Sequence, residues 1–412
     1  MTPRIQSIGA VEVLDSRGNP TVSAEVTLSD GTVAAASVPS GASTGSHEAV
    51  ELRDGGPRYA GKGVQQAVRN VSDVLAPALS GMSAEDQSAI DQRMIELDGT
   101  PNKSRLGANA ILAVSCAVAR AAASSRRMPL WRYLAAGRAA VLPVPMVNIL
   151  SGGLHAQGGF DFQDFLVIPQ GFASFAEALE AVVGVHRATR SVLDERGYTI
   201  AGVADEGGWG PRLPGNETAL EILSAAIDRA GGRMAMAIDV AATHFFRDGR
   251  YLLASERRSL TSEEVIALLG RWITQYPIVS IEDGLAEDDW SGWRQLTAAL
   301  ASRVQLIGDD LFATSLVRLE RGIASGAANA VLVKMNQAGT LTETFAVIDR
   351  ARSAGYHAVV SARSGETEDP FLADLAVASG AGQIKIGSVR TSERLSKYNR
   401  LLKLAAGLPW AG

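Results

Sequence analysis

The chain has 412 residues, with 39 lysines and arginines against 44 aspartates and glutamates, so its formal net charge is −5. Hydrophobic residues make up 46% and charged residues 20%, which is the balance of a folded globular protein and excludes a disordered one. One cysteine excludes an intramolecular disulfide and fits a reducing compartment, and the mild negative charge argues against nucleic acid or membrane as the main partner. Because the chain also has no apolar run of membrane-spanning length, we expect a cytoplasmic enzyme or binding protein.

The first third of the chain predicts a three-stranded meander followed by helices. β-Branched residues alternate or cluster in three segments separated by Gly, Pro, Asn and Asp, namely residues 5–14, 21–28 and 32–38. A loop rich in Gly and Ser follows, and helical patterns then cover residues 64–79, 84–97 and 107–124. We therefore expect an α+β cap domain over residues 1–130.

From about Val144 onward, short apolar strands alternate with amphipathic helices. Five successive strands end at residues 282, 309, 334, 361 and 385, at intervals of 27, 25, 27 and 24 residues. This is the repeat of a strand plus a helix, and continuous apolar strands favour a parallel sheet covered on both faces. We expect the second domain, residues 140–412, to be a (β/α)₈-type barrel.

Five of the barrel strands end in ionisable residues, which are Asp239, Glu282, Asp309, Lys334 and Lys385. The carboxyl ends of parallel barrel strands converge on one face, where barrel enzymes carry their active sites, so these side chains are expected to share a pocket. The simpler alternative is that each acid caps the helix that follows it. The number of ionisable groups in register favours the pocket.

Three carboxylates without Cys or His at ligand spacing suit a hard cation such as Mg²⁺, which prefers oxygen ligands. Such an ion neutralises a substrate carboxylate and stabilises the dianion formed when the adjacent carbon loses a proton. The base for that step must be uncharged, and a lysine beside cations has a lowered pKa. Among 33 arginines and only six lysines, Lys334 lies between Asp309 and Lys385 in strand order and is the predicted base.

Two glycine-rich segments leave alternatives open. Residues 40–45 (SGASTG) can wrap a phosphate or a metal with hydroxyls and backbone groups, or form an ordinary surface loop, because the ending of a P-loop is missing. Residues 204–209 (ADEGGW) place Glu206 beside two glycines, where it can act as a general acid or simply belong to a turn.

Longer motifs resemble the enolase family over nearly the full length of the chain. The matching segments are residues 15–22, 40–45, 205–208, 280–285, 308–312, 336–344, 363–369 and 396–399. The resemblance implies an enolase-type barrel behind a cap domain, a homodimer, and the interconversion of 2-phosphoglycerate and phosphoenolpyruvate with two Mg²⁺ ions. It also implies that Asp239, Glu282 and Asp309 hold the first ion, and that Ser43 helps to bind the second.

The resemblance also implies roles for the remaining site residues. Lys334 corresponds to the base that removes the C2 proton, and Lys385 to the group that binds the substrate carboxylate. Arg363 and Ser364 correspond to the phosphate ligands, and Gln163 to a further substrate-binding residue. The acid that helps hydroxide to leave C3 is implied to be Glu206, with His155 and Asp164 as the other catalytic residues of that half of the site.

Several residues depart from the family pattern, and two of them belong to the half of the site that assists the departing hydroxyl. Asp164 stands where the family has a glutamate, and Ala362 stands where it has a histidine. The family's Asp-Asn pair after Ala156 is also absent, Ile386 replaces a usual threonine, and Ser23 and Lys403 replace a subunit ion pair. Small displacements of such groups cost on the order of a hundredfold in rate.

Three functions therefore remain open. The first is the family's carbon–oxygen lyase reaction on a small phosphorylated three-carbon acid. The second is a related enzyme of phosphonate biosynthesis that forms carboxyphosphonoenolpyruvate from an enolpyruvate or phosphoglycerate unit and activated phosphonoformate, with the space at Ala362 admitting the larger group. The third is a non-catalytic scaffold, which predicts an eroded set of carboxylates and lysines that this sequence does not show.

Overall fold

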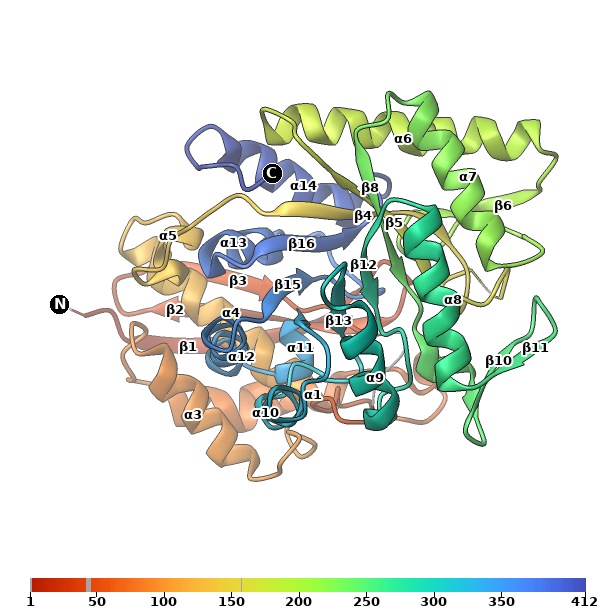
Figure 1. Cartoon of the computed structure of the whole chain (residues 1–412). Helices are drawn as coiled ribbons and strands as arrows, with labels where there is room; N and C mark the ends of the chain where they lie inside the picture. Colours follow the sequence, from red (N-terminus) through yellow and green to blue (C-terminus); the bar gives the residue numbers. More distant parts are fainter. Residues whose placement is uncertain (1, 42–45, 157) are drawn as a thin grey trace.

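The computed structural model describes residues 2–41, 46–156 and 158–412, so Ser43 lies outside the described residues. The N-terminal sheet has the order β1-β2-β3 and is antiparallel, as the sequence predicted. Its strands are β1 (Ile5–Leu14), β2 (Pro20–Leu28) and β3 (Val33–Ser37). Figure 1 shows this sheet, in red, lying beside the larger C-terminal part of the molecule.

The helical segments of the N-terminal part are η1 (Arg58–Gly61), α1 (Gln65–Asn70), the π-turn η2 (Val71–Leu75), α2 (Ala76–Leu79), α3 (Gln87–Asp98), α4 (Ala108–Ser125) and α5 (Leu130–Ala135). Helix α4 packs against β2 and β3 of this sheet, while α1, η2 and α2 contact β1. The inward side chains of β2, from Val22 to Leu28 at every second position, are fully buried where the sheet packs against α4. Contrary to the expectation that no apolar run reaches the length of a membrane span, α4 is long and apolar enough to cross a membrane by length and composition, but 83% of it is buried inside the protein, as a core helix is.

Eight strands of the C-terminal part close into a barrel, because β16 pairs with β4. In barrel order they are β4 (Val144–Ser151), β5 (Asp164–Pro169), β8 (Met234–Asp239), β12 (Ile278–Glu282), β13 (Gln305–Gly308), β14 (Ala330–Val333), β15 (His357–Ser361) and β16 (Gly382–Gly387). The short strands β6 (Ile200–Val203) and β7 (Trp209–Pro211) extend the sheet from β4. The predicted barrel behind a cap domain is confirmed.

One strand departs from the parallel sheet that the sequence predicted. Strand β5 runs antiparallel to both of its neighbours, β4 and β8. The described residues between β4 and β5 contain no helix, so the chain returns directly and pairs in the opposite direction, whereas a parallel partner requires a crossover. The first residue of β5, Asp164, therefore lies at the same end of the barrel as the last residues of its neighbours, Ser151 and Asp239.

The barrel interior explains why the charged residues meet at that end. An apolar cluster fills the interior with Met146, Leu166, Ile168, Ala235, Ala237, Ile307, Ala330, Leu332 and Val359. Side chains alternate between the two faces of a strand, so the residue two positions beyond an inward one also points inward. Ala237 is thus followed by Asp239, Ile307 by Asp309 and Leu332 by Lys334, which places all three charges on top of the apolar filling.

Helices and a small three-stranded antiparallel sheet, β11-β10-β9, lie around the barrel (Figure 1). They are α6 (Phe175–Glu195), α7 (Asn216–Arg229), η3 (Ala242–Phe245), β9 (Phe246–Arg247), β10 (Arg250–Leu253), β11 (Arg258–Leu260), α8 (Ser262–Gln275), α9 (Trp290–Leu300), α10 (Leu316–Ser325), α11 (Met335–Ala338), α12 (Leu341–Ser353), α13 (Phe371–Ser379) and α14 (Ser392–Ala405). Helix α8 begins with a capping box between Thr261 and Glu264, in which two otherwise unpaired backbone donors find acceptors.

The cap domain contacts the carboxyl end of the barrel through its first loops. Ser40 and Gly365 form a β-bridge, and the backbone of Ser16 donates to the carbonyl of Glu366. The buried Asp15 carboxylate holds the Ser40 hydroxyl at 2.5 Å. These contacts fix the segment that leads into residues 42–45 next to the strand end that carries Arg363.

Candidate active site

A cavity at the carboxyl end of the barrel gathers most of the residues predicted from the sequence. It is lined by His155, Gln163, Glu206, Asp239, Ala241, His244, Asp283, Asp309, Asp310, Lys334, Ser361, Ala362, Arg363, Ser364 and Lys385. Glu282 lies directly beside it, in contact with Lys385. Among the described residues, Asp164 is the one predicted site residue that neither lines the cavity nor contacts one of its lysines.

Lys334 and Asp309 form a direct ion pair within this cavity. The Lys334 side chain projects from the end of β14, and the following residues turn at once into the short helix α11. Burial disfavours the charged form of Lys334, but the surrounding carboxylates, Asp309 first and Glu282 next, together outweigh burial and raise the pKa of the amine. The sequence predicted the opposite direction, a lowered pKa. A lowered pKa of the Lys334 amine requires cations beside it that offset the charge of the carboxylates.

Lys385 bridges two of the buried carboxylates. Its Nζ lies 2.8 Å from Asp239 Oδ2 and 2.7 Å from Glu282 Oε2. Gln163 Nε2 donates to the same Asp239 oxygen at 3.1 Å. Burial opposes the charge on Lys385, yet Asp239 and Glu282 together raise its pKa well above the ordinary value. The amine is therefore a fixed positive charge at the centre of the cavity.

The donor set of the cavity fits a divalent cation with oxygen ligands. Burial, together with the charges of Asp239 and Asp309, raises the pKa of Glu282 well above its usual range. The ligand oxygens of Asp283, Asp309 and Asp310 lie within 4.8 Å of one another, whereas the other two members of the predicted ligand set, Asp239 and Glu282, are bridged by Lys385. Carboxylates crowded in this way repel each other, and lysine contacts balance only part of their charge. Mg²⁺ is the ion that such an all-oxygen set suits best.

Arg363 and Ser364 extend the cavity toward the cap domain. Arg363 Nη1 donates to Glu48 Oε2 and to Asn336 Oδ1, each at 3.0 Å, and its side chain is 4% exposed. The planar guanidinium is suited to a phosphate or carboxylate group, which it can bind through two parallel hydrogen bonds. No pattern in the sequence indicates that Glu48, just beyond the glycine-rich loop, reaches this arginine.

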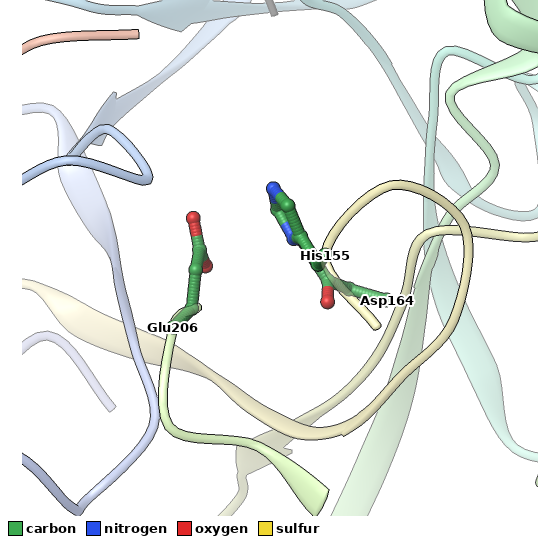
Figure 2. Close-up of side chains that lie close together, drawn as sticks. All are labelled: His155, Asp164 and Glu206. Atoms are coloured by element: carbon green, nitrogen blue, oxygen red, sulfur yellow. The ribbon is translucent and has the colours of Figure 1, made fainter. Parts of the chain in front are cut away.

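His155, Asp164 and Glu206 form a second group, whose ligand atoms also lie within 4.8 Å of one another (Figure 2). His155 Nδ1 lies 3.0 Å from Asp164 Oδ2, while His155 and Glu206 line the cavity. Burial alone would lower the pKa of His155, but Asp164 raises it to about 9. A charged imidazole beside Glu206 can donate a proton to a departing oxygen.

Two further residues of the site were not found from the sequence. His244 lines the cavity from η3, and it was not among the site residues predicted from the sequence. Arg394 is fully buried on α14 and donates to the carbonyls of Arg363 and Ser364 at 2.7 Å each. The local sequence of α14 does not indicate such a role for Arg394, because the two carbonyl acceptors lie about 30 positions away in the chain.

Comparison with known protein families decides the relationship. The profile of "Enolase, N-terminal domain" matches residues 5–134, and that of "Enolase, C-terminal TIM barrel domain" matches residues 139–409. The chain belongs to the enolase family. A curated enolase from Acidothermus cellulolyticus is 56% identical over 404 residues, which cover 97% of this chain and 94% of that protein. The resemblance drawn from the sequence motifs is confirmed, and the protein is an enolase-superfamily lyase.

The two sides of the enolase cavity differ in how far they follow the family pattern. Lys334, Lys385, Arg363 and Ser364 all line one cavity. Within the site, the departures lie beside His155 and at Ala362, whose methyl group also lines the cavity. The described residues that the resemblance assigns to proton abstraction and phosphate binding therefore share one cavity, and the departures lie among those that it assigns to the leaving group.

Proposed function

We propose that this enolase-family protein interconverts 2-phosphoglycerate and phosphoenolpyruvate, with Mg²⁺ bound by Asp239, Glu282 and Asp309. The observation that carries the proposal is the meeting of two lysine amines, Lys334 and Lys385, with buried carboxylates in one cavity beside an arginine. Enolases generally depend on Mg²⁺, and the crowded carboxylates of this cavity fit that ion. When bound, the ion would supply positive charge that stabilises a substrate carboxylate carrying a second negative charge.

The remaining chemistry belongs to side chains of this chain. In the direction of dehydration, Lys334 takes the C2 proton onto Nζ, and the electron pair moves into the substrate carboxylate beside Lys385. The C3–oxygen bond then breaks as the double bond between C2 and C3 forms. Glu206 or His155 protonates the departing hydroxide, so that water leaves. Arg363 and Ser364 hold the phosphate throughout, which keeps C2 near Lys334.

The test follows the ultraviolet absorbance of the enol phosphate after 2-phosphoglycerate and Mg²⁺ are added. Removal of a general base costs about a hundred- to ten-thousandfold in rate, so Lys334→Ala should be nearly inactive. Lys103→Ala is the matched control, because Lys103 is also buried and ion-paired, to Glu343 at 2.9 Å, but lies outside the cavity. The proposal fails if wild-type protein makes no enol phosphate or if Lys334→Ala equals wild type.

A second candidate reaction is favoured by the altered side of the cavity. Ala362, which lines the cavity next to Arg363, has a smaller side chain than the histidine usual in the family, and Asp164 is absent from the lining. Such a cavity can admit a larger phosphorus group than phosphate, as in the formation of carboxyphosphonoenolpyruvate from an enolpyruvate or phosphoglycerate unit and activated phosphonoformate.

The two reactions are separated by presenting a nucleotide-activated phosphonoformate together with phosphoenolpyruvate or 2-phosphoglycerate. Product formation there, with slow turnover of 2-phosphoglycerate alone, supports the second reaction. The double reversion Ala362→His, Asp164→Glu should then raise dehydratase activity. Rapid turnover of 2-phosphoglycerate by the wild type, with no reaction of the phosphonoformate donor, supports the first reaction and excludes the second.

A further inference from the structure

Asp164 reaches the carboxyl end of the barrel only because β5 runs backwards. Its strand register pairs it with Ser151 at the end of β4 and with Asp239 at the end of β8. The side chain is fully buried, and it does not contribute to the cavity lining. A carboxylate in that position cannot touch a substrate, so any effect on the reaction has to pass through a neighbour.

The hydrogen bonds of Asp164 identify that neighbour. Its Oδ1 accepts from Asn148 Nδ2 at 2.6 Å and from Ser151 Oγ at 2.8 Å, and its Oδ2 lies 3.0 Å from His155 Nδ1. Asn148 Nδ2 also donates to Ser151 Oγ at 3.0 Å, which ties the two donors together. With one oxygen held by two donors, the carboxylate can turn only its other oxygen toward the imidazole.

We propose that Asn148 and Ser151 are positioning residues that hold Asp164 against His155 Nδ1 and thereby present His155 Nε2 to the cavity. This inference rests on the proposed function, in which His155 serves the leaving group. A carboxylate bonded to one ring nitrogen keeps the proton on that nitrogen and sets the direction in which the other nitrogen points. In this chain Asp164, whose side chain is shorter than the family's glutamate, therefore orients the proton donor His155 and does not itself donate a proton.

The loop that carries Glu206 lies directly on the same network. A Cβ at Gly208 would stand 2.7 Å from Asn148 Oδ1 and 3.0 Å from Ser151 Oγ, so only glycine fits there without displacing them. Asn148 Oδ1 is buried and accepts no hydrogen bond from any described residue, so the amide is oriented by the bonds of its nitrogen to Asp164 and Ser151. The network therefore lies beneath both residues of the leaving-group side, His155 and Glu206.

The experiment compares Ser151→Ala and Asn148→Ala with wild-type protein in the 2-phosphoglycerate assay and by nitrogen NMR of selectively labelled histidine. Ser280→Ala is the matched control, because Ser280 is also a buried serine on a barrel strand. Its hydroxyl donates to Gln305 Oε1 at 3.0 Å and makes no bond to His155 or Asp164. The His155 signals are assigned by their disappearance in His155→Gln.

Both network variants should lose about tenfold to a hundredfold in kcat with KM changed less than about twofold, since a misplaced catalytic group costs about that much. The proton on His155 Nδ1, held in the wild type, should exchange faster or shift, while Ser280→Ala leaves both readouts unchanged. Network variants that match Ser280→Ala in kcat and in the His155 signals overturn the inference. A wild type that makes no phosphoenolpyruvate refutes the proposed function instead, and the NMR comparison alone then decides the positioning.

Discussion

Arg394 offers the sharpest test of how the phosphate side of the site is held. Its guanidinium is fully buried and donates to three backbone carbonyls, those of Arg363 and Ser364 at 2.7 Å and that of Ile386 at 2.9 Å. One side chain on α14 thus joins the ends of β15 and β16, which carry the proposed phosphate ligands and Lys385. Replacing it with methionine keeps much of the volume and removes all of the donors.

The cost of Arg394→Met follows from these contacts. Each hydrogen bond from a charged donor contributes about 1.5–3 kcal/mol, but neighbouring bonds are not additive, and loss of a buried charged partner typically costs about 3–5 kcal/mol. We therefore expect a loss of about 4 kcal/mol in the free energy of unfolding. For 412 residues the unfolding entropy is about 0.9 kcal/mol/K, so the melting temperature should fall by about 5 °C.

Thermal unfolding followed by circular dichroism measures this shift, with Arg350→Met as control. Arg350 also makes two bonds to an acid, Glu320, but both side chains are about a third to a half exposed, so its loss should cost less than about 1 kcal/mol. In the activity assay Arg394→Met should raise KM for 2-phosphoglycerate about tenfold or more, because the backbone of Arg363 and Ser364 loses its anchor. Equal melting temperatures for the two variants would refute the reasoning.

Three other predictions concern acid stability, metal and the Glu206 loop. Burial against Trp209 lowers the pKa of His186 to about 4. The free energy of unfolding should therefore keep the full contribution of the neutral imidazole above about pH 6.5 and lose about 3 kcal/mol as the pH falls toward 4. His186→Phe should therefore narrow the difference in melting temperature between pH 7 and pH 4, and an unchanged difference would contradict the assignment. Mg²⁺ at about a hundred times its dissociation constant should raise the stability by about 3 kcal/mol, and this rise should vanish in Glu282→Gln; a rise that survives there places the ion elsewhere. Gly208→Ala, whose Cβ would meet Asn148 Oδ1 at 2.7 Å, should lower kcat while far-ultraviolet circular dichroism stays unchanged, and full activity would show that the loop has room to move.

The barrel was predictable from the sequence because its signals are local. A strand and a helix repeat every 24–27 residues, and five of the strands end in an ionisable residue where the carboxyl ends of parallel barrel strands converge. The strand pattern alone therefore assigns Asp239, Glu282, Asp309, Lys334 and Lys385 to one pocket. The structure places four of them in the cavity lining and Glu282 in contact with Lys385.

The direction of β5 was not predictable in the same way. Its residues are uniformly buried, so their pattern is that of any central strand and says nothing about direction. Only the pairing with β4 and β8 shows that its beginning, rather than its end, lies at the face that carries the site. The sequence motif therefore identified Asp164 as a site residue but could not show that it stands behind His155.

Contacts between residues that are far apart in the chain could not be predicted from the sequence. Spacing along the chain determined which side chains reach the mouth of the barrel, because the alternation of a strand and the length of a strand-helix unit are properties of neighbouring residues. Tertiary structure alone decided what each of them touches there: Glu48 meets Arg363 across 315 positions, and Arg394 binds carbonyls about 30 positions away. Such contacts arise from the closure of the barrel and the docking of the cap domain, and no local pattern of residues encodes them.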